Sequence, residues 1–358
     1  MVILDSTFTD NAAAVWGGAI FATDQVTAKE SRFTDNHVRG AEELAEGGAI
    51  FAVACSCDVA IEIVESTVTG NSVETSHPAP SIVDGGGLTG LGKVDIEDST
   101  IADNSTRAPA APELFGGGGG VVAGGSLSAL NSTITDNEVD MPGGAGGGIL
   151  SEPEGPLGEP AVELAYTDVV DNSASSGANL AVLNIEAAGV SVLRDSVDRA
   201  GVLPEFAEVS SGEVDAQVVP GAETMLASFA SVITDPSGGG DNCSGFETTE
   251  SSGWNFADDD SCDLDESTDS QRESNDPLLG DLADNGGPTE TLLPASDSPL
   301  VNAVQPQSCQ SDGAHGVSVD QRGFPRPAPG HLRCDIGAVE IETETVPLPL
   351  VIVPTFTG

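Results

Sequence analysis

Two short motifs alternate through the first half of this chain of 358 residues. The first is a glycine pair followed by a small and an apolar residue, and it occurs at 17–20, 47–50, 85–88, 118–121 and 146–149, with a weaker copy at 177–180. The second is Ser-Thr-apolar-x-x-Asn or a close variant, and it ends at Asn11, Asn36, Asn71, Asn104 and Asn137, with a weaker copy ending at Asn172. Such a repeat is typical of a solenoid, in which each unit buries its apolar face only by stacking on its neighbours.

The sequence between the motifs predicts short strands. Residues 118–137 show the pattern best, because apolar runs alternate at period two and glycine pairs separate them. Strands this short, repeated with tight turns, stack in parallel on the equivalent strands of the next unit. The predicted fold class is therefore all-β: a single-stranded, right-handed parallel β-helix, similar to the pectate lyase solenoid.

The six asparagines that end the second motif have a predicted structural role. Asparagine tolerates left-handed backbone conformations, and an inward asparagine can hydrogen-bond its equivalent one coil away. We therefore expect Asn11, Asn36, Asn71, Asn104, Asn137 and Asn172 to form one inward line at a turn. The neighbouring Ser-Thr pairs are interpreted as strand residues and not as nucleophiles, because no histidine recurs beside them.

The net charge of −47 restricts the partners. Nucleic acids and anionic membranes require clustered Lys and Arg, and the chain has only two lysines, Lys29 and Lys93. No apolar stretch of about 18 residues is present, so membrane insertion is not expected. No cofactor is assigned; Ca²⁺ is the candidate, although the acidic run at 258–266 lacks the glycine of a typical Ca²⁺ loop.

Four of the six cysteines suggest local disulfides. Cys243 and Cys262 bracket one loop-rich stretch, and Cys309 and Cys334 bracket another, so each pair can form a bridge in an oxidising compartment. The state of Cys55 and Cys57 is left open, because no further Cys or His lies at metal-ligand spacing.

The segments between each Asn and the next glycine pair vary in length, and three of them are candidate binding loops. They span 37–46, 72–84 and 105–117, in consecutive repeats, so we expect them to lie side by side on one edge of the solenoid. The candidate binding residues are His37, Arg39, Glu42, Glu43, His77, Asp84, Arg107 and Glu113. No catalytic and no metal-binding residues are assigned.

Two family resemblances follow from these motifs. The alternation of Gly-Gly-Ala-Ile with Phe-Thr-Asp-Asn at 8–11 and 33–36 resembles the repeats of polymorphic outer-membrane proteins, which are surface β-helices. The ordered motifs at 242–245, 276–280, 284–289, 292–299, 320–323 and 334–340 resemble the choice-of-anchor Q domain. That resemblance implies a bacterial or archaeal surface β-helix and no catalytic residues. The tail at 341–358 has no intact sortase motif.

The resemblances and the repeat together predict the domain organisation. Regular repeats are expected at 1–185, truncated at the N-terminus because residue 1 leads directly into a repeat strand; irregular coils at 186–270; a choice-of-anchor Q-like segment at 271–340; and a tail at 341–358. Prolines lack the amide donor that extends a sheet, so the proline-rich segment 277–329 is expected to cover the open end of the solenoid as an irregular cap.

Two functions from different classes remain open. The first is a secreted or cell-surface module that binds a carbohydrate or another cell-surface ligand without catalysis, as a monomer. The second is a polysaccharide lyase or glycoside hydrolase on the same scaffold. A lyase needs a basic residue beside carboxylates, which the few Lys and Arg supply poorly, whereas the 58 acidic residues offer many candidate pairs for a glycosidase.

Overall fold

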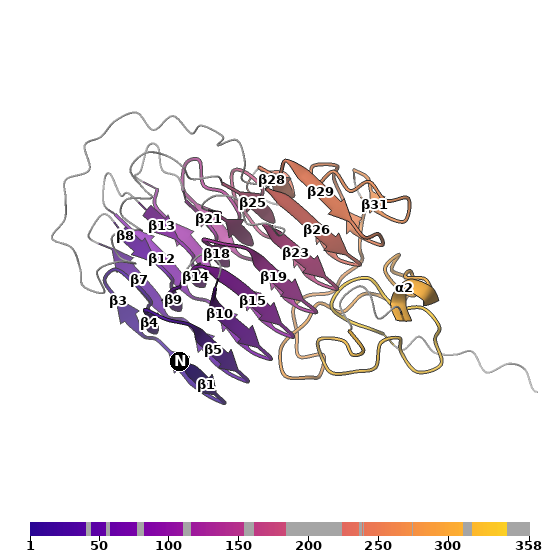
Figure 1. Cartoon of the computed structure of the whole chain (residues 1–358), viewed down its shortest axis with the longest axis horizontal. Coiled ribbons are helices and arrows are strands. Elements are labelled where there is room, and N and C mark those ends of the chain that lie inside the picture. The colour runs from indigo at the N-terminus through magenta and orange to yellow at the C-terminus, as the bar shows by residue number, and fades with distance from the viewer. Residues whose placement is uncertain are drawn as a thin grey trace, which may run out of the picture.

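The chain folds into a parallel β-helix with a separate lobe at its side (Figure 1). The computed structural model describes residues 1–40, 44–54, 58–76, 82–109, 116–153, 161–183, 224–235, 238, 240–273, 275–310 and 317–341. Strands of successive coils lie next to each other and pair in parallel, from the indigo first coil to the orange last one. The predicted parallel β-helix is therefore confirmed.

Two long sheets form adjoining sides of the solenoid. Sheet A contains β1 (Val2–Leu4), β5 (Val26–Lys29), β10 (Val59–Val64), β15 (Lys93–Glu97), β19 (Leu127–Leu130), β23 (Val162–Ala165), β26 (Met225–Phe229) and β29 (Thr248–Ser251). Sheet B contains β2 (Thr7–Thr9), β6 (Arg32–Thr34), β11 (Thr67–Thr69), β16 (Thr100–Ala102), β20 (Thr133–Thr135), β24 (Asp168–Val170), β27 (Val232–Thr234), β30 (Phe256–Ala257) and β31 (Ser270–Gln271).

Three further sheets complete the coils. Sheet C contains β3 (Ala12–Ala13), β7 (His37–Gly40), β12 (Ser72–Thr75), β17 (Ser105–Arg107) and β21 (Glu138–Asp140). Sheet D contains β8 (Leu44–Glu46) and β13 (Ile82–Asp84). Sheet E contains β4 (Ile20–Ala22), β9 (Ile50–Val53), β14 (Leu88–Leu91), β18 (Val121–Ala123), β22 (Ile149–Ser151), β25 (Leu180–Val182) and β28 (Cys243–Ser244).

The main core runs along the inside of sheets A, B and E. One coil illustrates it: Leu88 from sheet E, Ile96 from sheet A and Ile101 from sheet B are all buried in it. Each of these strands alternates inward apolar and outward residues, which is the period-two pattern of the sequence. Burying one such side chain stabilises the fold by roughly 1.5–3 kcal/mol, so the stack of inward rows supplies most of the stability.

The two glycines of each pair have different roles. The first has a positive φ in every copy, +68° at Gly47 and +60° at Gly118, which a residue with a side chain adopts at a cost. The second approaches the next coil closely: a Cβ on Gly119 would lie 2.5 Å from the carbonyl oxygen of Gly147. The first glycine of each pair is therefore required by the turn, and the second by the close approach of the next coil.

The asparagines form a continuous hydrogen-bonded line along the corner between sheets B and C. In the middle of it, the backbone N and Nδ2 of Asn71 both donate to Oδ1 of Asn104, at 3.0 and 2.9 Å. Side-chain bonds of the same kind join Asn11, Asn36, Asn71, Asn104, Asn137, Asn172, Asn179 and Asn242, and the line ends on a carboxylate oxygen of Asp258. Apart from Asn11 at the first coil, these asparagines are buried.

A second polar line follows the corner between sheets A and B. The backbone N of each serine donates to the hydroxyl of the next, as from Ser66 to Ser99 at 3.1 Å. The hydroxyl of each serine also donates to a carbonyl of its own coil, as from Ser66 to Val64 at 2.7 Å. The serines of the Ser-Thr pairs, predicted to be strand residues, thus satisfy backbone groups at the turn between the strands.

The C-terminal end of the main core is closed by residues 258–273, which we call the plug. Leu264 of the plug is part of the main core. The plug also contains β31, which pairs in parallel with β30 of the last coil. The asparagine line ends on the plug carboxylate of Asp258. In the other line the backbone N of Ser231 donates to Oδ1 of Asn255, and the backbone N of Asn255 donates to the plug carboxylate of Asp269 at 2.8 Å.

The C-terminal lobe, residues 275–310 and 317–341, does not cover the end of the solenoid as predicted. It lies along the outer face of sheet B, where Figure 1 shows its yellow trace beside the later coils. Leu300, Val304 and Ile336 of the lobe pack on Val170 and Val232 of sheet B. The plug closes the end instead, so the prolines of the lobe serve a chain that wraps irregularly on a side face.

Both predicted disulfides are present. Cys243–Cys262 joins β28 to the plug, with a Cα–Cα distance of 5.0 Å. Cys309–Cys334 joins α2 (Pro306–Gln310) to the last motif of the lobe, with a Cα–Cα distance of 5.6 Å. Such bridges are typical of oxidising compartments. Cys55 and Cys57 lie outside the described residues.

Candidate functional site

The candidate site is the outer face of sheet C, where the predicted binding loops begin. Residues at alternate positions of this sheet, Val38, Val73 and Val139 among them, point away from solvent and form a small second core with Ala45 and Val83 of sheet D. Their neighbours in each strand must therefore face outward. Where the structure describes them, the segments predicted as loops consist mostly of strands of sheets C and D. This difference arises because the second core gives these strands an apolar face to bury.

One outward row of sheet C alternates in charge. The parallel register places Glu74 between Arg39 and Arg107, and Arg107 beside Asp140. Nε of Arg107 lies 3.0 Å from Oδ2 of Asp140, and both side chains are 48% exposed. Opposite charges on neighbouring strands attract weakly at such exposure, so the row presents donors and acceptors in turn to solvent.

The second outward row is polar and mostly uncharged. His37, Ser72, Ser105 and Glu138 occupy equivalent positions in four successive strands. The first three are half-buried and Glu138 is exposed. The two rows together give a flat polar strip in which equivalent residues repeat at the strand spacing, about 4.8 Å.

The structure separates the remaining predicted binding residues. Asp84 is not on this surface: it is fully buried in β13, and its Oδ1 accepts a 3.0 Å hydrogen bond from the backbone N of Gly117. Its predicted role in an exposed binding loop is therefore wrong, because the chain turns back there towards the glycine pair. Glu42, Glu43, His77 and Glu113 lie outside the described residues.

A row of aspartates runs beside the asparagine line. Each adopts a positive φ, close to +55°, at the corner between sheets B and C: Asp10, Asp35, Asp103, Asp136, Asp171 and Asp235. Gly70 takes this position in the third coil, with φ +67°. The backbone of the corner thus selects residues that tolerate the left-handed conformation, and stacking brings their charges together.

The aspartate row is electrostatically unfavourable. Partial burial, and then the carboxylates of neighbouring coils, raise the pKa of Asp171 to about 6. The same causes raise the pKa of Asp103 and of Asp235. Among the described residues no group of three or more His, Cys, Asp or Glu side chains is arranged to hold a metal ion. The carboxylates of the row therefore repel one another.

Asp171→Asn should stabilise the protein at alkaline pH. A carboxylate whose pKa is raised by folding destabilises the fold above that pKa and not below about pH 4. Asn keeps the shape and tolerates the corner conformation. Because the side chain is about half exposed, we expect a gain of only about 1 kcal/mol in the free energy of unfolding at pH 8, and no gain at pH 4. Urea unfolding measures both values, with exposed Asp24→Asn as the control. A gain of equal size at pH 4 would contradict the electrostatic cause.

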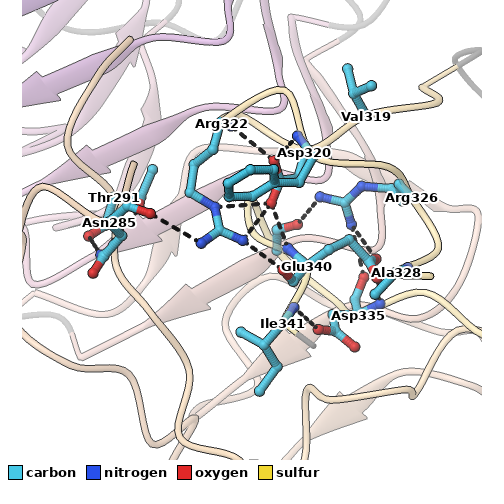
Figure 2. Close-up of polar contacts among 12 residues, drawn as sticks. Asn285, Thr291, Val319, Asp320, Arg322, Arg326, Ala328, Asp335, Glu340 and Ile341 are labelled. Atoms are coloured by element: carbon cyan, nitrogen blue, oxygen red, sulfur yellow. Dashed lines mark hydrogen bonds and ion pairs between the residues drawn. The ribbon is translucent and has the colours of Figure 1, made fainter. Parts of the chain in front are cut away.

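The last motifs of the chain form a buried network inside the lobe (Figure 2). Arg326 donates to Oε1 of Glu340 at 3.1 Å, and both side chains are buried. The carboxylate of Glu340 also accepts backbone hydrogen bonds from Asp335 at 2.7 Å and Ala328 at 3.2 Å. Burial raises the pKa of Glu340 to about 7 although the Arg326 charge lowers it. These motif residues thus have structural partners within the lobe.

The same motifs fasten the lobe to the solenoid. The side-chain amide of Gln321 donates to the carbonyl of Ser99 at 3.1 Å, and its oxygen accepts from the hydroxyl of Thr133 at 2.7 Å. Asn131 donates to the carbonyl of Val319 at 3.2 Å. These contacts join positions about two hundred residues apart in the sequence, which is why their role was not evident from the motif alone.

Fold and surfaces together define a parallel β-helix in which sheet C carries a row of alternating charge and a lobe packs on sheet B. Residues 5–23 match the family model of the Chlamydia polymorphic membrane protein (Chlamydia_PMP) repeat, so the predicted resemblance of the N-terminal repeats is supported. The comparisons with curated proteins and with solved structures found no match. In the described part of the chain, no helix is long and apolar enough to cross a membrane. A surface or outer-membrane type of β-helix protein is the class that these findings support, and the choice-of-anchor Q resemblance of the lobe stays a prediction.

Proposed function

We propose that this chain is a secreted or cell-surface β-helix protein that binds a carbohydrate through the outer face of sheet C, without catalysis. The observation that carries the proposal is the alternating row Arg39, Glu74, Arg107 and Asp140. Guanidinium groups donate and carboxylates accept hydrogen bonds, and a sugar hydroxyl does both. A row of alternating donors and acceptors at strand spacing therefore suits the hydroxyls of an extended glycan.

The charge balance of the face supports a carbohydrate over a polyanion. The whole chain has a net charge of −47 and repels nucleic acids and other bare polyanions. The outer row of sheet C, by contrast, pairs two arginines with two acids. Divalent cations are helpers for an acidic glycan, because they can bridge its carboxylates to those of the protein.

The alternative, a lyase or hydrolase, has less support on this face. Arg107 is paired with Asp140, and a guanidinium is in general a poor base. An enzyme would also have to release products, which provides a direct discrimination. If the purified chain cleaves neutral or acidic polysaccharides, the non-catalytic assignment is overturned.

Replacing Arg107 by Ser should weaken glycan binding without unfolding the protein. Arg107 is half exposed and contributes to no core, so circular dichroism should be unchanged, whereas binding on a glycan array should fall about tenfold because a charged donor pair is lost. Glu74→Ser should have a similar effect. Arg272→Ser, an exposed arginine of the plug, is the matched control. Unchanged glycan binding by folded Arg107→Ser and Glu74→Ser variants would place the site elsewhere.

A further inference from the structure

The interface between the lobe and sheet B contains more acid than base. On the solenoid side, Asp168 of β24 is completely buried, and its side chain accepts one hydrogen bond, from the backbone N of Ala338 at 3.2 Å. On the lobe side, Asp335 and Glu340 are buried as well. A single guanidinium, that of Arg326, faces all three carboxyl groups.

Arg326 is directed more to the lobe than to the solenoid. It pairs with Glu340, donates to the carbonyl of Asp335 at 3.1 Å and to that of Gly337 at 3.0 Å, and lies 4.0 Å above the ring of Tyr166. From the solenoid it contacts the Tyr166 ring and, through a longer hydrogen bond of 3.3 Å, Oδ1 of Asn131. Asp168 therefore depends on a cation that Glu340 already neutralises.

The surrounding groups do not restore the balance. In sheet B the residues in register with Asp168 are Thr133 and Val232, which are uncharged. Within the lobe, Asp320 holds Arg322 at 2.7 Å and also accepts from the backbone N of Glu340. His331 also faces Asp335, and Asp320 in turn faces Asp98 at the corner of sheets A and B.

We propose that the interface between the C-terminal lobe and sheet B is a proton-operated latch, in which protonation of Asp168 and Glu340 closes the lobe on the solenoid and their ionisation loosens it. A protonated carboxyl can stay in this apolar, closely packed place at little cost. Two carboxylates that share one guanidinium in a buried interface are costly, because burial penalises each charge and the second carboxylate has no compensating partner.

The direction of the pH effect follows from the shifts. Burial raises the pKa of Asp168 from 3.8 to about 7, and that of Glu340 from 4.5 to about 7. Groups that hold their protons more tightly when docked favour docking at low pH, and this advantage is lost as the pH rises from about 4 to about 7. The latch is therefore closed in acid and loosened at neutral and alkaline pH. Loosening would uncover the Thr-rich and apolar outer face of the later coils of sheet B.

Hydrogen exchange measures the latch directly. The backbone amides of Gly337 and Ala338 donate across the interface, to the carbonyl of Ala230 and to Asp168. Protection factors of a peptide spanning 335–341, corrected for the intrinsic pH dependence of exchange, should be at least about tenfold higher at pH 5 than at pH 8. A peptide from β10, in the middle of the solenoid, should change much less. Equal protection of the interface peptide at both pH values would overturn the proposal.

Neutral variants separate the latch from general acid stabilisation. The double variant Asp168→Asn, Glu340→Gln removes both charges and keeps one acceptor oxygen in each side chain, so its interface protection should be the same at pH 5 and pH 8. Asp297→Asn, an exposed acid of the lobe, should behave like the wild type. If the double variant retains the pH dependence, the proposal is wrong.

Fluorescence gives a second reading on the wild-type interface. Trp254 packs against the apolar contact between lobe and sheet B, and in a Trp16→Phe background it is the sole tryptophan. Its emission should shift to longer wavelength between pH 5 and pH 8 if the lobe loosens. A constant emission across this range would overturn the proposal even if the double variant did not fold.

Discussion

Arg326→Met is expected to lower the free energy of unfolding at pH 7.5 by about 3–5 kcal/mol, because it removes the guanidinium that faces the buried carboxyl groups of Asp168 and Glu340. Methionine is similar in length and apolar, so it preserves the packing against Tyr166 but cannot donate to Glu340 or to the carbonyl groups of Asp335 and Gly337. The loss should appear as a lower midpoint in urea unfolding.

The cause can be tested by a second substitution and by pH. Adding Glu340→Gln removes the unpaired charge and should recover at least about 1 kcal/mol of the loss, since a neutral buried group costs less than a buried carboxylate. At pH 5, where Glu340 is protonated, Arg326→Met alone should cost less than at pH 7.5. Arg272→Met, on an exposed side chain, is the control. A loss that is independent of both pH and Glu340 would assign the effect to packing.

The regular coils could be predicted from the sequence because the signal is local and repeated. The glycine pair, the asparagine and the period-two apolar pattern each occur once per coil, so one correct interpretation applies to all of them. The structure adds that Asn179 and Asn242 continue the asparagine line. They occupy the place of the small residue that precedes the apolar residue of the first motif, which is why the second motif could not indicate them.

The side strands and the lobe could not be predicted in the same way. The strands of sheet C are two to four residues long and mostly polar on one face, and their apolar face becomes evident only when sheet D is placed opposite. The position of the lobe depends on contacts such as that of Gln321 with Ser99, which are separated by 222 residues. The order of the motifs indicates that the residues of the lobe form one unit, but no local pattern shows which solenoid residues they contact.

Asn104→Ala is expected to lower the free energy of unfolding by about 2–4 kcal/mol, from the loss of hydrogen bonds in the middle of the asparagine line. Oδ1 of Asn104 accepts from the backbone N and Nδ2 of Asn71, and its Nδ2 donates to the carbonyl of Val68 at 3.0 Å and to Asn137 at 2.9 Å. All of these groups lie in the interior, where water cannot replace the missing partner.

The matched control is Asn11→Ala, the same motif position in the first coil. Asn11 is exposed, and its side chain donates to Asn36 without accepting from another asparagine of the line. Its loss leaves groups that water can reach, so we expect a cost below about 1 kcal/mol. Urea unfolding of the two variants under the same conditions gives the difference. If they lose equal stability, the line contributes through the corner conformation of each coil and not through hydrogen bonds between coils, and the ladder explanation of the repeated asparagine fails.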